Sequence, residues 1–173
     1  KVRSCFLSFR LDSASYFINR ISAFCDAHAG SPEIAQLYAM AYNARGNIYV
    51  RKSLADSACQ CYLKSFEYAT RGGSKGSLPD ICLNLADVYV KQGRYDLGAL
   101  WYNRSLSIAD SLDMPDEKRF PAYYGLAQVN MELRDFAACD YYYNLASRYY
   151  DKMHPFEKHI YLNNRGNSYY YRQ

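Results

Sequence analysis

A short segment of the chain occurs more than once, and its spacing limits what the chain can fold into. Residues 45–49 read RGNIY and residues 165–169 read RGNSY, with related copies LADVY at 85–89 and LAQVN at 126–130. The small residues of these copies stand in register at Gly46, Ala86, Ala127 and Gly166. The steps between the four positions are 40, 41 and 39 residues. A period of this length predicts a repeat protein, in which each unit packs against its neighbours.

Within each copy the residues have helical spacing. Tyr42, Gly46 and Tyr49 stand at i, i+4 and i+7, which is one face of a helix, and Ala58 and Tyr62 begin the same pattern in a second helix. The pattern predicts an all-α chain built of helix hairpins. Glycine inside a helix costs about 1 kcal/mol relative to alanine. We therefore expect the glycines of the pattern to lie where two helix backbones come close, with a tyrosine of the second helix beside them.

These residues resemble the tetratricopeptide repeat (TPR). The resemblance is carried by Cys82, Leu85, Ala86 and Tyr89 in a first helix and by Tyr95, Gly98 and Tyr102 in a second. The chain departs from the family in its period, which is about 40 residues instead of about 34. Arg45 and Arg165 also replace a leucine of the family pattern, and Asn130 replaces a tyrosine. The resemblance implies a right-handed superhelical solenoid of antiparallel helix hairpins.

The period divides the chain into units. We expect one TPR-like domain over residues 1–173, with a degenerate repeat at 1–30, repeats at 32–72, 77–113 and 115–152, and an incomplete repeat at 155–173. The residues expected to pack helix against helix occupy the small, aromatic and leucine positions of the pattern. They are Tyr42, Gly46, Tyr49, Ala58, Tyr62, Leu85, Ala86, Tyr89, Gly98, Tyr102, Leu126, Ala127, Cys139, Tyr143, Gly166 and Tyr169.

The resemblance also implies a function. Hairpins of this family stack into a curved array whose first helices line a concave groove, which binds a protein or peptide partner. The residues at the groove positions are Asn43, Asn47, Arg51, Asn84, Asp87, Lys91, Tyr124, Gln128, Asn163, Asn167 and Tyr170. Many are amides, and asparagine offers an extended peptide backbone both a donor and an acceptor. The alternative is that these polar side chains are simply solvated on an exposed helix face.

Two other functions stay open. Long-period TPR arrays rich in tyrosine resemble the sensory segments of bacterial membrane-associated sensor kinases and transcriptional regulators. The chain has 20 tyrosines, and the surplus at 141–143, 149–150 and 169–171 is a candidate carbohydrate-binding surface, although we favour packing between helices. Because the last repeat stops within its first helix, we expect the chain to be part of a longer protein. We also expect such an open repeat to favour self-association of the isolated chain.

Charge and hydropathy argue against two classes of partner. The net charge is +4, with lysine and arginine scattered among the acids, whereas a nucleic-acid-binding domain usually has a dense basic face. No apolar run approaches the ~20 residues that span a bilayer, so we expect no membrane insertion of this segment. The segment contains no targeting signal, and cytoplasm and periplasm both stay open as compartments.

No group of residues predicts catalysis. His154 and His159 stand five apart without ligand partners at metal spacing, and His28 stands alone. The segment GGSKGS at 72–77 lies between two helical patterns and does not match a phosphate-binding loop. The six cysteines form no CxxC pair and are expected to be buried thiols. We therefore predict no enzyme activity, no metal site and no cofactor.

Overall fold

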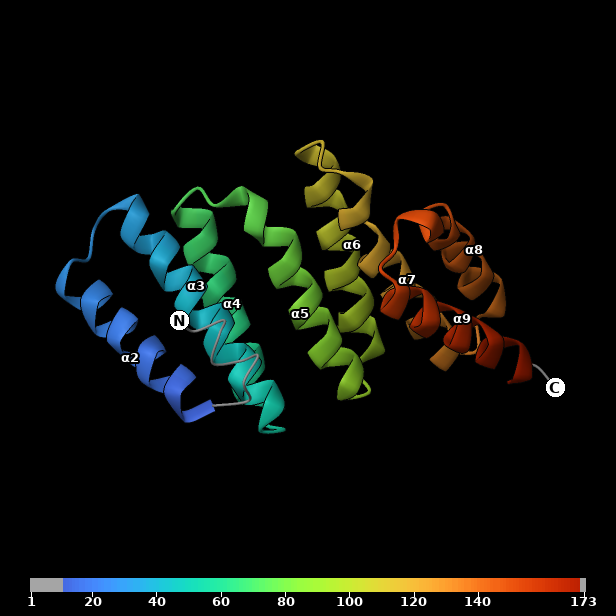
Figure 1. Cartoon of the computed structure of the whole chain (residues 1–173), viewed down its shortest axis with the longest axis horizontal. Helices are drawn as coiled ribbons and strands as arrows, with labels where there is room; N and C mark the ends of the chain where they lie inside the picture. The colour runs from blue at the N-terminus through green and yellow to red at the C-terminus, as the bar shows by residue number, and fades with distance from the viewer. Residues whose placement is uncertain (1–10, 172–173) are drawn as a thin grey trace. The chain divides into compact units, whose positions relative to one another are not determined.

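The computed structural model describes residues 11–171, except for the side chains of residues 156 and 157. Within this range the chain is all-α and contains no strand, as predicted. The helices are α2 (Leu11–Ala27), α3 (Pro32–Arg51), α4 (Ala55–Arg71), α5 (Leu78–Lys91), α6 (Tyr95–Ser111), α7 (Phe120–Glu132), α8 (Phe136–Ser147) and α9 (Pro155–Tyr170) (Figure 1). The short 3-10 turns η1 (Lys75–Ser77), η2 (Asp116–Lys118) and η3 (Tyr150–Lys152) precede α5, α7 and α9.

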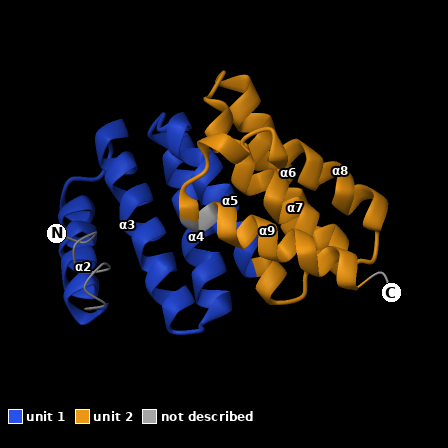
Figure 2. Cartoon of the chain, turned by 45° about the vertical axis from the view of Figure 1, so that its right-hand side comes forward, with its two compact units in different colours: residues 1–88 blue, residues 89–173 orange. Residues whose placement is uncertain are grey.

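The chain forms two compact units, residues 1–88 and residues 89–173 (Figure 2). In unit 1, α3 packs against both α2 and α4. In unit 2, α7 packs against α6, α8 and α9. A helix that the sequence assigns to the first position of a hairpin is therefore the central element of each unit. The division of the chain into five repeats stays a prediction, and the pairs α3–α4, α5–α6 and α7–α8 lie within its boundaries.

The period of about 40 residues also appears in the backbone of the turns. The turn after each first helix contains one residue with positive φ, namely Ser53 at 58°, Gly93 at 73° and Arg134 at 60°. After Ser53, the amide of Leu54 donates to the carbonyl oxygen of Tyr49 at 2.9 Å, and the equivalent bonds after Gly93 and Arg134 have the same length. This hydrogen bond is the Schellman helix ending. Glycine adopts the left-handed conformation without strain, whereas serine and arginine adopt it at a cost.

Two glycines lie where helices approach closely. A Cβ atom added to Gly46 of α3 would lie 2.7 Å from Cδ1 of Tyr62 in α4, well inside van der Waals contact. A Cβ atom added to Gly125 of α7 would lie 2.5 Å from Cε1 of Tyr102 in α6. The tyrosine ring takes the place that a side chain at the glycine would occupy. This arrangement is the one expected for Gly46, whereas Gly125 was not among the expected positions.

Most of the residues expected to pack are buried. The buried ones are Gly46, Ala58, Tyr62, Leu85, Ala86, Tyr89, Gly98, Tyr102, Leu126, Ala127, Cys139 and Tyr143, while Tyr42 and Tyr49 are half-buried. The expectation is wrong for Gly166 and Tyr169 of α9, which are exposed. No heavy atom lies within 4 Å of a Cβ placed on Gly166. The physical reason is that the described residues contain no second helix after α9 to cover this face as α4 covers α3.

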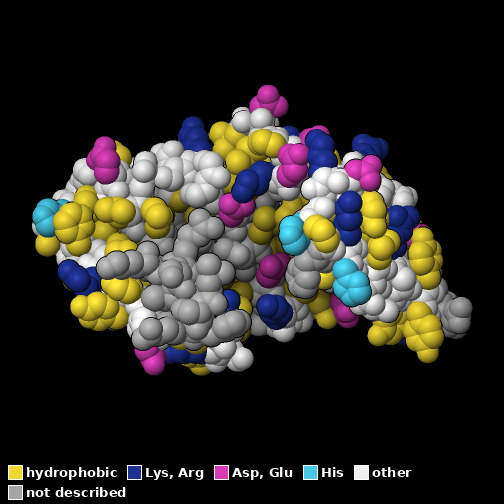
Figure 3. All heavy atoms as spheres, viewed as in Figure 1, with side chains coloured by type: hydrophobic (Ala, Val, Ile, Leu, Met, Phe, Trp, Pro, Cys, Tyr) yellow, Lys and Arg dark blue, Asp and Glu magenta, His cyan; other side chains and the backbone are white. Residues whose placement is uncertain are grey.

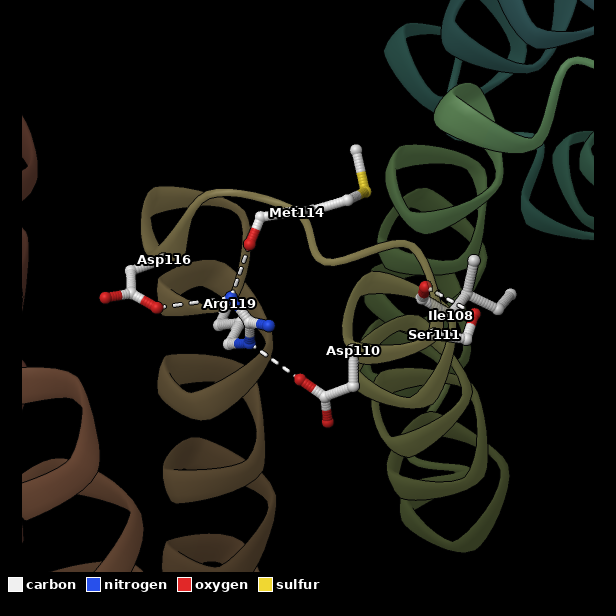
Figure 4. Close-up of polar contacts among 6 residues, drawn as sticks. All are labelled: Ile108, Asp110, Ser111, Met114, Asp116 and Arg119. Carbon is white, nitrogen blue, oxygen red and sulfur yellow. Dashed lines mark hydrogen bonds and ion pairs between the residues drawn. The ribbon is translucent and has the colours of Figure 1, made fainter.

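Arg119, a half-buried side chain, holds the turn between α6 and α7 of unit 2. The side chain of Arg119 is 13% exposed and donates from Nε to Asp110 at 2.7 Å and from one terminal nitrogen to Asp116 at 3.2 Å. The same terminal nitrogen donates to the carbonyl oxygen of Met114 at 2.6 Å (Figure 4). Arg119 thus joins the end of α6, the loop and the start of α7 through one planar group.

Candidate functional site

The residues expected at groove positions lie on α3, α5, α7 and α9, the helices that the sequence assigns to the first position of each hairpin. Five of them are half-buried: Asn43, Asn47, Asn84, Tyr124 and Gln128. The other six are exposed: Arg51, Asp87, Lys91, Asn163, Asn167 and Tyr170.

In unit 1 the half-buried amides are joined to one another and to the core. Nδ2 of Asn84 in α5 donates to Oδ1 of Asn43 in α3 at 3.0 Å. One turn further along α3, Oδ1 of Asn47 accepts a hydrogen bond from the hydroxyl of Tyr62 in α4 at 2.6 Å. The first contact links two helices of the candidate face, and the second fixes the face to the buried ring that lies against Gly46. The amides of α3 are therefore held in place from two sides.

Unit 2 contains a related contact at the same repeat position. Nδ2 of Asn164 in α9 donates to the hydroxyl oxygen of Tyr124 in α7, and Nε2 of Gln128 donates to the same oxygen at 3.0 Å. Asn84 follows Asn43 by 41 residues, and Asn164 follows Tyr124 by 40 residues. The sequence expectation placed the neighbouring residue, Asn163, in this role. Asn164 was missed, although adding one period to Tyr124 identifies it.

Burial and nearby charge keep the core tyrosines protonated. Burial raises the pKa of Tyr62, and the carboxylate of Asp87 adds to the effect. Burial likewise raises the pKa of Tyr143, the residue of α8 that corresponds to Tyr62. Tyr62 therefore acts as a neutral hydrogen-bond donor to Asn47. The buried hydroxyl of Tyr143 has no hydrogen-bond partner in the described part of the chain.

Much of the tyrosine surplus is used in packing. Tyr42 and Tyr68 stack in unit 1 with ring centroids 5.6 Å apart and planes at 6°. Tyr123 and Tyr149 stack in unit 2 at 6.3 Å and 0°. Each member of the second pair follows its counterpart by 81 residues, or two periods. The exposed tyrosines are Tyr16, Tyr141, Tyr169, Tyr170 and Tyr171.

The described residues contain no cluster suited to catalysis or metal binding. Among them, no three or more histidine, cysteine, aspartate or glutamate side chains gather at a metal-binding distance. His28 stacks on Phe24 with ring centroids 4.3 Å apart and bonds to its carbonyl oxygen at 2.8 Å. Cys25, Cys59, Cys61, Cys82 and Cys139 are buried and not in disulfides, while Cys5 lies outside the described residues.

Charged side chains of both signs lie on the surface of the described residues. On the face shown in Figure 3, dark blue and magenta side chains are interspersed over both units. Within the described range, no helix is long and apolar enough to cross a membrane.

Comparisons with known proteins give the same fold class. The model of the tetratricopeptide repeat family matches residues 79–111. The crystal structure of BtubC (BKLC) from P. vanneervenii superposes with a TM-score of 0.80 at 16% sequence identity, over 97% of this chain and 68% of that one. No curated protein matches the chain. TPR repeats generally mediate protein interactions. Residues 79–111 are therefore a tetratricopeptide repeat, and the chain has the fold of a TPR-type helical-repeat protein.

Proposed function

We propose that this chain is a non-enzymatic scaffold that binds an extended segment of a partner protein along its first helices. The observation that carries the proposal is the hydrogen-bonded amide pair Asn43–Asn84, which joins α3 to α5 on the face expected to bind. The related contact between Tyr124 and Asn164 supports it, because it occupies the equivalent position in unit 2.

The Asn43–Asn84 pair has the chemistry to bind a peptide group. Their hydrogen bond uses one N–H of Asn84 and the oxygen of Asn43. The oxygen of Asn84 and the NH₂ group of Asn43 keep the capacity to accept and to donate. A peptide group presents one N–H and one C=O, so one backbone unit can bond to both side chains whatever its own side chain is. Because the pair is already fixed, binding loses little side-chain freedom.

A purely structural role makes a different prediction. If the pair only joins α3 to α5, removing it lowers the melting temperature and leaves partner binding unchanged. If the pair binds a partner, removing it weakens binding in a chain that remains folded. Asn47 is a poor probe, because its loss leaves the hydroxyl of Tyr62, which is 2% exposed, without its acceptor. Asn84 is therefore the better residue to substitute in a test of partner binding.

The test uses a displayed library of random peptides selected against the immobilised chain. The affinity of a selected peptide is then measured by calorimetry for the parent, Asn84→Ala and the control Gln60→Ala. Gln60 is an exposed amide on α4 of the same unit. We expect Asn84→Ala to weaken binding about tenfold, which is about 1.4 kcal/mol, and Gln60→Ala to leave it unchanged. Equal affinities for all three folded proteins, or no selected peptide at all, would contradict the proposal.

A further inference from the structure

A separate hollow lies in unit 1, away from the first-helix amides. Its volume is ≈ 400 Å³, and it is formed by the turn between α2 and α3, the start of α3 and the end of α4. Sites for small molecules have volumes of roughly 300–1,000 Å³ and are mostly apolar with a few polar groups. The hollow has both properties, since Pro32, Ile34 and Ala35 supply apolar surface, Tyr38 and Tyr68 supply aromatic surface, and Arg71 supplies a charge.

The tyrosine side chains that line the hollow are fixed by ring stacking and by a hydrogen bond to α2. The rings of Tyr38 and Tyr68 stack with centroids 4.7 Å apart and planes at 20°. Tyr68 stacks in turn on Tyr42, at 5.6 Å and 6°. The hydroxyl of Tyr38 donates to Asp26 of α2. The three stacked rings are tied to α2 and fix one another, so this side of the hollow needs no rearrangement to receive a ligand.

The two helices that form the hollow are also fixed to each other. Nε2 of Gln36 in α3 donates to the carbonyl oxygen of Gly72 at 2.8 Å. A Cβ atom on Gly72 would lie 2.9 Å from the backbone oxygen of Pro32, so only glycine allows this approach. Gly72 itself is buried. The shape of the hollow is therefore fixed by contacts between α3 and the end of α4.

The charges around the hollow favour an anion. Arg71 is its charged lining residue, and its contact with Glu67 is a 3.5 Å pair in which both side chains are more than half exposed, at 66% and 58%. Such a surface pair is weak, and it uses one of the five N–H groups of the guanidinium. The acidic side chains near the hollow already accept hydrogen bonds. Asp26 accepts one from Tyr38, and a hydrogen bond from Ser31 lowers the pKa of Glu33.

The geometry points to a binding site for a monocarboxylate with a compact apolar or aromatic body. Its carboxylate pairs with the fork of Arg71, which matches the two oxygens. Its body lies against the side chains of Tyr38, Tyr68, Ile34 and Ala35, which line the hollow. A free acid and the C-terminal residue of a peptide share this chemistry. The site goes beyond the proposed scaffold function, because it lies on different residues.

Nuclear magnetic resonance of the ¹⁵N-labelled chain tests the site with 3-phenylpropionate as the free acid and acetyl-Gly-Gly-Phe as the peptide. The uncharged amides of both compounds serve as ligand controls. We expect saturable shifts at the backbone amides of Gly30 and Ala35 and at Nε of Arg71, with a dissociation constant on the order of 1 mM for the free acid. We expect the two amides to bind at least fivefold more weakly.

Two variants identify the recognising group. Arg71→Met weakens binding of the acids at least fivefold, whereas Arg20→Met, which removes an exposed arginine from α2 of the same unit, leaves it unchanged. Tighter binding of the peptide acid identifies a C-terminal residue as the natural source, and tighter binding of 3-phenylpropionate identifies a free acid. Equal binding of acid and amide, equal binding to Arg71→Met, or no saturable shift would overturn the proposal.

Discussion

The close approach of α3 and α4 at Gly46 makes a quantitative prediction about Gly46→Ala. The added Cβ atom lies within 2.7 Å of the ring of Tyr62. The ring cannot withdraw easily, because it is 2% exposed and its hydroxyl bonds to Asn47 at 2.6 Å. The two helices must therefore separate. Overpacking costs about 1–3 kcal/mol, and a contact this short against a held ring belongs to the upper half of that range, about 2–3 kcal/mol. Alanine returns about 1 kcal/mol of helix propensity.

We therefore expect Gly46→Ala to lower the free energy of unfolding by about 1–2 kcal/mol and the melting temperature by about 2–8 °C. Gly166 is the matched control, since it has the same repeat position and open space where its Cβ atom would lie. Gly166→Ala should gain up to about 1 kcal/mol from helix propensity alone. Far-UV circular dichroism during heating and in urea measures both variants.

A third variant isolates the clash. In Gly46→Ala combined with Tyr62→Leu, the alanine meets a smaller side chain, so the double variant should be more stable than the sum of the two single changes indicates. If Gly46→Ala is as stable as the parent, or gains stability as Gly166→Ala does, then the helices do not approach as closely as described. The explanation of the glycine at this position would then fail.

The remaining predictions also concern stability. Tyr143→Phe should leave the free energy of unfolding in urea unchanged or raise it, because it removes a buried hydroxyl without a partner. Tyr62→Phe should lower it by about 1 kcal/mol. The reverse order would contradict the hydrogen bonding described. Burial raises the pKa of both tyrosines, so stability is full below the unfolded pKa of about 10 and falls as pH rises above it. Melting temperatures measured from about pH 8 upward should decline less steeply for Tyr143→Phe than for the parent, and equal slopes would count against a buried neutral hydroxyl. Arg134→Gly should gain about 1 kcal/mol, because Arg134 has a φ of 60°; a loss of stability in urea would show that the turn does not strain it. Arg119→Met should cost about 1–3 kcal/mol, because the carbonyl of Met114 and the two acidic side chains lose their donor. An unchanged melting temperature would show that this half-buried arginine does not hold the turn.

Helical spacing and the period were sufficient to predict the fold class and the pairing of Gly46 with Tyr62. They did not predict Gly125, because the sequence pattern relates Tyr102 to Gly98 in its own helix, four residues before it. The ring of Tyr102 instead lies against Gly125 of the next helix. A contact between successive hairpins depends on how the helices pack, and one sequence does not contain that information.

Three of the residues expected at groove positions make the contacts between helices described above. Asn43, Asn84 and Tyr124 lie in the contacts described, but on α9 the contact is made by Asn164 and not Asn163. Neighbouring helix residues point about 100° apart, and a period that varies by one residue cannot choose between them. The hollow near Arg71 could not be predicted at all, because it depends on the close approach of Pro32 and Gly72.

The most direct test of binding along the first helices is the resonance of the asparagine side-chain NH₂ groups in the ¹⁵N-labelled chain, recorded with and without a selected peptide. Binding through the amide pair predicts saturable shifts for Asn43 and Asn84 and none for Gln60 on α4. Shifts at Gln60 or around the hollow, with Asn43 and Asn84 unchanged at saturation, would contradict it.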